Sequence, residues 1–295
     1  MSGMNDELWE HFKPLWNDFQ AVDGSILVAG GYGLYLKQQW LRQQSDPVIV
    51  VPLSRWLDAS PRVTKDLDLV IALDLIADQA KNRQMLSVLE AQGFCVSVKP
   101  GGKRWQFVKD LGNERRVIAE LHASTPGDEH TLLKADKIRV KRKPSMGDEG
   151  VHGRLNPEAV GATIQPFSFL HEDTRLTLPN ALTWSVMKIT AAQDRWQTSQ
   201  DTITGEEPRS FSRAQAIKHG YDVFRVVAMM SMDERDDCAR VKEAIRETPE
   251  FQNAATLYRD FFVGTENWAN EVLKDKWLPA DFEVIHSVLA SWYNS

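Results

Sequence analysis

The hydrophobic pattern of the chain changes at Pro179, and this change limits the fold more than any other feature of the sequence. Before Pro179, short apolar runs alternate with turn residues, which is typical of strands. The runs interpreted as strands are residues 26–29, 67–72, 94–98, 105–108, 117–121 and 167–170. Helical patterns lie between them, one after Gly33 and one over residues 76–91, and Gly93 ends the second. We therefore predict that residues 1–178 form an α/β (α+β) domain with a mixed sheet.

After Pro179 the strand signal disappears and long amphipathic segments follow. These segments are residues 181–196, 212–232, 235–247, 252–262, 265–277 and 280–293, so residues 179–295 are expected to form a helical domain. The polar, aperiodic residues 198–210 are interpreted as a flexible connection. One more amphipathic helix is expected within residues 1–20, as part of the first domain.

Composition excludes several classes of protein. With 42% hydrophobic and 26% charged residues, the chain is neither low-complexity nor largely disordered. Its two cysteines, Cys95 and Cys238, cannot build a disulfide framework or a four-thiolate zinc site, so a reducing cytoplasm is expected. Apolar runs fall far short of the roughly 20 residues of a membrane span, and we expect none. The net charge of -6 argues against general coating of nucleic acid but allows a local basic patch.

A glycine pair stands where a predicted strand meets a predicted helix, in the sequence ILVAGGYGLYL. Gly30 and Gly31 give this corner a flexible backbone, and the start of the helix supplies free N–H groups. Such a corner suits the close approach of an anion such as a phosphate. Close packing of helix on strand is the alternative explanation for the glycines.

Two aspartates, Asp66 and Asp68, lie in the predicted strand of RVTKDLDLVIA. Because side chains alternate along a strand, both carboxylates are expected on one face, with Leu67 and Leu69 on the other. Carboxylates at this spacing suit Mg²⁺, which binds one or two of them together with substrate phosphates. A solvated edge strand is the alternative.

A third carboxylate is expected from Glu120 in RRVIAELHAS. Alternation puts Glu120 on the polar face of its strand, and an adjacent strand could bring it beside Asp66 and Asp68. Three carboxylates are needed to hold two metal ions. Glu120 could instead be an exposed glutamate, and His122 is interpreted as a structural or surface histidine rather than a catalytic one.

The glycine corner followed by the acidic strand resembles the nucleotidyltransferase superfamily of DNA polymerase β type, and within it the AbiEii-like family, which includes toxins of toxin-antitoxin pairs. Two later segments are similar to motifs of that family. TLPNALTWSVMKITAAQDR matches a helix that follows a proline and carries a lysine and an arginine, here Lys188 and Arg195. KHGYDVFRVV matches a basic stretch followed by an aspartate, here Lys218 and Asp222.

The resemblance implies roles for these residues. Asp66, Asp68 and Glu120 would hold Mg²⁺, while Gly30 and Gly31 would let backbone N–H groups reach the phosphates of an NTP. From the rest of the chain, Lys188 would contact the triphosphate, and Asp222 would orient Lys188 or the base. Lys65 would lie at the entrance of the site. A surface lysine and a salt bridge between helices are the alternatives for Lys188 and Asp222.

The acceptor is the least constrained part of this hypothesis. Residues 134–143, KADKIRVKRK, have six basic side chains and one acidic, which could follow a phosphate backbone or form a solvated hairpin. The resemblance therefore implies a cytoplasmic enzyme that moves a nucleoside monophosphate to a hydroxyl on RNA, such as a tRNA end. As a toxin it would have an antitoxin protein as partner. Transfer to a small molecule such as an antibiotic, and nucleotide binding without catalysis, are the alternatives.

Overall fold

The computed structural model describes residues 7–60, 64, 66–72, 75–76, 78–97, 103–124, 138–139, 150–203, 205–264 and 267–294. Contacts divide the chain into two compact units. The first comprises Met1–Leu36, Arg62–Ala159 and Ser168–Leu178, and the second comprises Lys37–Pro61, Val160–Phe167 and Pro179–Ser295.

Two segments that the sequence analysis assigns to residues 1–178, Lys37–Pro61 and Val160–Phe167, fall in the second unit. Backbone hydrogen bonds explain the first assignment, because the N–H groups of Val50 and Val51 donate to the carbonyls of Met230 and Ala228. Such pairing links residues far apart in the sequence, and hydrophobic periodicity does not report it.

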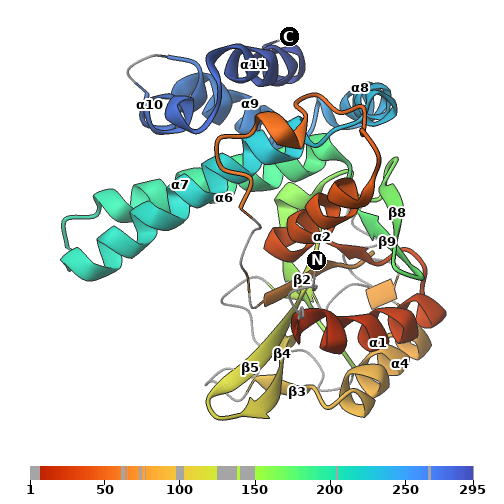
Figure 1. The fold of residues 1–295 in the computed structure, drawn as a ribbon. Coiled ribbons are helices and arrows are strands. Elements are labelled where there is room, and N and C mark those ends of the chain that lie inside the picture. The colour runs from red at the N-terminus through yellow and green to blue at the C-terminus, as the bar shows by residue number, and fades with distance from the viewer. Residues whose placement is uncertain are drawn as a thin grey trace. The chain divides into compact units, whose positions relative to one another are not determined.

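The first unit has the predicted α/β class, with a mixed sheet (Figure 1). Its strands are β1 (Leu27–Val28), β2 (Asp66–Val70), β3 (Cys95–Ser97), β4 (Lys103–Gly112), β5 (Arg115–Ala123), β6 (Ile138–Arg139) and β7 (Gly153–Leu155). Among the residues described, the strand order is β1-β2-β5-β4-β3, with β7 paired to β5 and β6 paired to β7. The pairs β2–β5, β5–β7 and β6–β7 are parallel, and the others are antiparallel.

Helices and a hairpin complete the first unit. Helix α1 (Glu7–Val22) buries Trp9, Phe12, Leu15, Trp16 and Phe19 and packs beside α4 (Gln79–Ala91), as Figure 1 shows. Strands β8 (Phe167–His171) and β9 (Thr174–Leu178) form a separate hairpin, which α1 joins through a hydrogen bond from Trp16 Nε1 to the carbonyl of Arg175. Helix α2 (Gly30–Gln43) begins in this unit, directly after β1.

The second unit is mainly helical, as predicted. Its helices are α6 (Ala181–Gln200), α7 (Glu206–Ala228), α8 (Met232–Ile245), α9 (Pro249–Phe262), α10 (Trp268–Leu273) and α11 (Pro279–Tyr293). Short 3-10 turns occur at Leu53–Arg55 and Lys274–Lys276, and a third, Pro157–Ala159, lies in the first unit. Helices α6 and α7 pack side by side along their length (Figure 1).

The connection predicted over residues 198–210 is shorter than expected. Helix α6 continues to Gln200 and α7 already begins at Glu206. The first turn of α7 holds Glu206, Glu207 and Pro208, residue types that favour a helix start although they break the hydrophobic pattern.

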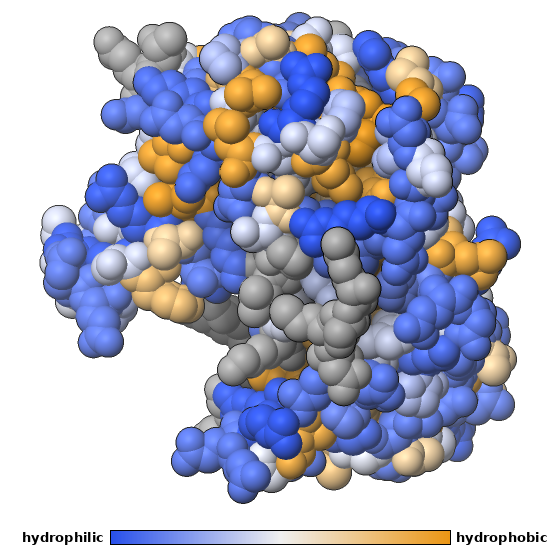
Figure 2. Space-filling view, in the orientation of Figure 1, coloured by the Kyte–Doolittle hydropathy of each residue, from blue (hydrophilic) through white to orange (hydrophobic). Residues whose placement is uncertain are grey.

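Hydrophilic side chains cover most of the face drawn in Figure 2, with apolar areas between them. Among the described residues, the most exposed large apolar side chains are Ile203 at 95% and Val48 at 77%, and they belong to separate segments of the chain. Within the described ranges, no helix is both long enough and apolar enough to cross a lipid bilayer.

Candidate metal site

Strand β2 positions the two aspartates as the sequence predicts. Asp66 and Asp68 alternate with Leu67 and Leu69, both of which are fully buried. The apolar face of the strand therefore anchors it in the core, and the opposite face carries the carboxylates. Asp68 is half-buried and Asp66 is exposed.

The parallel pairing of β2 with β5 brings Glu120 directly beside Asp68 in the register of the two strands. Ala119 and Leu121 on either side of Glu120 are fully buried, which fixes the face on which Glu120 lies. The expectation that an adjacent strand brings Glu120 to the aspartates is thus confirmed for Asp68.

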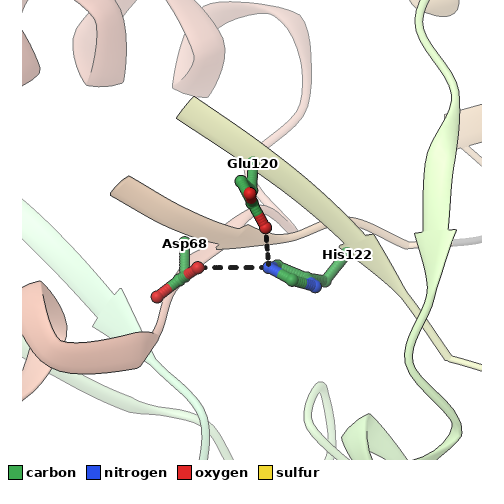
Figure 3. A group of neighbouring side chains, drawn as sticks. All are labelled: Asp68, Glu120 and His122. Carbon is green, nitrogen blue, oxygen red and sulfur yellow. Dashed lines mark hydrogen bonds and ion pairs between the residues drawn. The ribbon is translucent and has the colours of Figure 1, made fainter. Parts of the chain in front are cut away.

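His122 completes a group of three side chains, drawn in Figure 3. Its Nε2 lies 3.2 Å from Asp68 Oδ1 and 3.7 Å from Glu120 Oε2. One possible ligand atom from each residue lies within 4.8 Å of the other two. Only 8% of His122 is exposed, so the interpretation as a surface histidine is wrong.

The glycine corner lies against this group. Gly30 has a φ of +63°, and a Cβ atom there would lie only 1.8 Å from Asp68 Oδ2. The N–H of the preceding Ala29 donates to the carbonyl of Asp68, at 2.8 Å. Gly30 therefore meets two conditions that only glycine satisfies: a left-handed backbone and the absence of a side chain. Gly31 follows as the second residue of α2.

Two residues that the sequence analysis did not single out hold Glu120 in place. Gln106 lies opposite Glu120 in the β4–β5 pair and donates from Nε2 to Oε1 at 2.6 Å. Arg154 from β7 donates from Nη1 to Oε2 at 3.1 Å, and its guanidinium lies 5.1 Å from the ring centre of Trp105. Both carboxylate oxygens of Glu120 therefore have fixed partners, which orient the side chain.

Other predicted site residues are placed differently. Asp66 does not belong to the group of three. Lys65 lies outside the described residues, as does most of the basic segment 134–143. The described part of that segment is β6 (Ile138–Arg139), which pairs in parallel with β7, with Arg139 beside Arg154 in the register.

Lys188 and Asp222 form an ion pair in the second unit, with Lys188 Nζ 3.3 Å from Asp222 Oδ2. Lys188 is 6% exposed and Asp222 is 1% exposed, so the alternative of a surface lysine is wrong. The prediction that Asp222 orients Lys188 agrees with this pair, and so does the alternative of a salt bridge between α6 and α7.

Arg225 is a further buried cation that the sequence analysis missed. It follows Asp222 by three positions on α7, donates to the carbonyl of Ser60 at 2.9 Å, and lies 4.4 Å from the ring centre of Tyr221. Burial raises the pKa of the Tyr221 hydroxyl, and the nearby Arg225 partly opposes this. Residues three positions apart share one face of a helix, so the spacing between Asp222 and Arg225 was the sequence signal that could have identified Arg225.

The group of Asp68, Glu120 and His122 fits a divalent cation. Two carboxylates within a few ångströms repel each other unless a positive charge lies near them. Oxygen donors are those that Mg²⁺ prefers, and an imidazole nitrogen adds a donor that Mn²⁺ and Zn²⁺ also accept. The start of α2 at Gly30 adds backbone N–H groups, which favour negative charge.

Comparisons with known proteins establish no family for the chain. No protein-family model matches the sequence. No curated protein matches it either. A solved structure described as an antigenic nucleotidyltransferase-like protein from Paracoccidioides brasiliensis is similar over 85% of this chain and 92% of that chain, with 14% identity and a TM-score of 0.36. At this TM-score the likeness carries no conclusion about fold or activity.

Proposed function

We propose that the chain is a metal-dependent nucleotidyltransferase that moves a nucleoside monophosphate from an NTP to an acceptor hydroxyl. One observation carries this proposal: Asp68 and Glu120 lie side by side on parallel strands, with the backbone of Gly30 packed against the Asp68 carboxylate. We propose that the cation binds at these carboxylates and that a phosphate of the NTP binds beside it, within the same unit.

The proposed reaction needs positioning and charge neutralisation more than covalent help from the protein. The acceptor oxygen forms a bond to the α-phosphorus while the bond to pyrophosphate breaks, and the hydroxyl proton passes to a base. Mg²⁺ supplies charge neutralisation on the phosphates. Asp68 and Glu120 would hold the ion, and the N–H groups at the start of α2 would bind phosphate oxygens.

Further residues enter the proposal from the sequence resemblance. Lys188 is proposed as a triphosphate contact and Asp222 as the residue that orients it. The basic segment 134–143 is proposed to bind an RNA acceptor, and an antitoxin protein is the proposed partner.

A transfer assay tests the proposal. Purified full-length protein is incubated with each NTP, labelled at the α-phosphate, together with Mg²⁺ and total RNA, and the products are separated on a gel. We expect a labelled RNA band, which is absent when the label is on the γ-phosphate. Asp68→Asn should lower the rate about a hundredfold or more. Glu90→Gln, which changes an exposed carboxylate on α4, is the matched control.

Two results would contradict parts of this proposal. Label on a small hydroxylated molecule, with RNA unlabelled, would replace the RNA acceptor by a small one. Binding of NTP without pyrophosphate release from any tested acceptor would replace catalysis by nucleotide binding alone.

A further inference from the structure

We propose that His122 is a ligand of the metal ion in this site, and that the site therefore selects Mn²⁺ over Mg²⁺ more strongly than an all-oxygen site does. This inference rests on the proposed function, because it concerns the same metal site. It adds a donor that the sequence analysis did not assign to the metal.

The first argument is geometric. His122 is 8% exposed, and its Nε2 lies 3.2 Å from Asp68 Oδ1 and 3.7 Å from Glu120 Oε2. Ligands about 2.1 Å from an octahedral ion lie about 3 Å apart when adjacent and about 4 Å apart when opposite. The two distances from Nε2 fall in this range, and the ligand atoms of all three residues lie within 4.8 Å of one another (Figure 3).

The second argument concerns the nitrogen lone pair. Nε2 faces one oxygen of each carboxylate, so a nitrogen donor and two oxygen donors converge on one point. Among the described residues, Nδ1 of His122 is buried without a hydrogen-bond partner. The contacts of the ring with Asp68 and Glu120 are thus made by Nε2, the atom that faces the two carboxylates.

The third argument is the chemistry of the donors. Mg²⁺ is a hard ion that binds oxygen and keeps its water, whereas first-row transition ions also accept imidazole nitrogen. A set of two carboxylates and one imidazole therefore raises the affinity for Mn²⁺ relative to Mg²⁺. Gln106 bonds to Oε1 of Glu120, whereas Arg154 bonds to Oε2, the oxygen that lies near His122, so a bound ion competes with Arg154 for this atom.

The test uses the full-length protein without nucleotide and measures binding of Mn²⁺ alone and Mg²⁺ alone by calorimetry. Pulsed electron paramagnetic resonance of bound Mn²⁺ reports directly coordinated nitrogen. His122→Gln places an amide at the position of the nitrogen donor. His171→Gln is the matched control, because His171 is also 8% exposed but lies in the β8–β9 hairpin against Trp9.

We expect a nitrogen coupling in the wild-type Mn²⁺ spectrum that disappears in His122→Gln and persists in His171→Gln. The ratio of the Kd for Mg²⁺ to the Kd for Mn²⁺ should fall by about tenfold or more in His122→Gln. A wild-type spectrum without nitrogen coupling would overturn the inference, and this result needs no variant to fold. An unchanged Kd ratio in folded His122→Gln would also overturn it.

The failure of this inference can be told apart from failure of the proposed function. If both ions bind through Asp68 and transfer occurs, but no nitrogen is coordinated, only the role of His122 is wrong. If the wild type binds neither ion, or if Asp68→Asn binds Mn²⁺ as the wild type does, the proposed metal site itself is wrong.

Discussion

Replacing Gly30 by alanine tests whether the glycine corner and the acidic group form one unit. The residue has a φ of +63°, which costs an L-residue about 1–2 kcal/mol. The new Cβ would also lie 1.8 Å from Oδ2, 2.6 Å from Cγ and 2.7 Å from Cβ of Asp68. Since three atoms of the side chain clash, a rotation of the carboxylate alone does not relieve them.

Gly112 provides the matched control, because its φ is +75° and a Cβ there would meet nothing within 4 Å. Gly112→Ala should therefore show only the backbone cost, reduced by the lower entropy of alanine in the unfolded chain, or about 1 kcal/mol. Gly30→Ala should show this cost together with overpacking of about 1–3 kcal/mol. We expect a total loss of about 2–4 kcal/mol in the free energy of unfolding.

Urea denaturation followed by circular dichroism measures both losses, and calorimetry with Mn²⁺ measures the site. Gly30→Ala should weaken Mn²⁺ binding because Asp68 must leave its position beside His122, whereas Gly112→Ala should bind Mn²⁺ as the wild type does. Equal stability losses in the two variants, with unchanged Mn²⁺ affinity in folded Gly30→Ala, would refute the close approach of Gly30 to Asp68.

Three other predictions concern charged and buried groups. Asp66→Asn should reduce nucleotidyl transfer less than Asp68→Asn, since Asp66 is outside the group of three; equal rates in the two variants would contradict this. Lys188→Met should destabilise the fold by about 3–5 kcal/mol by leaving Asp222 buried without its ion pair, and adding Asp222→Leu should restore most of the loss in thermal unfolding. Burial raises the pKa of the Tyr293 hydroxyl above its ordinary 10.0. The unfolded chain therefore loses this proton first as the pH rises, and the free energy of unfolding falls above about pH 10. Tyr293→Phe should make this fall with pH less steep, by up to about 1.4 kcal/mol per pH unit.

The sequence predicts those parts of the site that depend on local periodicity. Alternation along β2 follows from Leu67 and Leu69, which must face the core, so the face that carries Asp68 was predictable. Glu120 was a candidate for the same reason. Its exact partner was not predictable, because β2 and β5 are parallel and α4, β3 and β4 lie between them in the sequence.

Gln106 could have been predicted from the turn that joins β4 to β5. Residues equidistant from a hairpin turn pair with each other, and Gln106 and Glu120 lie symmetrically about Asn113. Arg154 gave no comparable signal, because it reaches Glu120 through the parallel pairing of β7 with β5. Periodicity therefore does not predict contacts that depend on the parallel pairing of strands far apart in the sequence.

The charges around Asp68 and Glu120 indicate how tightly the site should hold a metal ion. Arg154 pairs with Glu120, but 47% of the Arg154 side chain is exposed, so water weakens this pair. The pair of Lys188 with Asp222, by contrast, is almost fully buried, and separating it would leave an uncompensated charge. Arg154 can therefore give up Glu120 to a divalent ion at little cost, but its presence lowers the affinity of the group for a free ion. Tight binding then requires additional oxygen ligands, and the phosphates of an NTP beside the start of α2 are suitable donors.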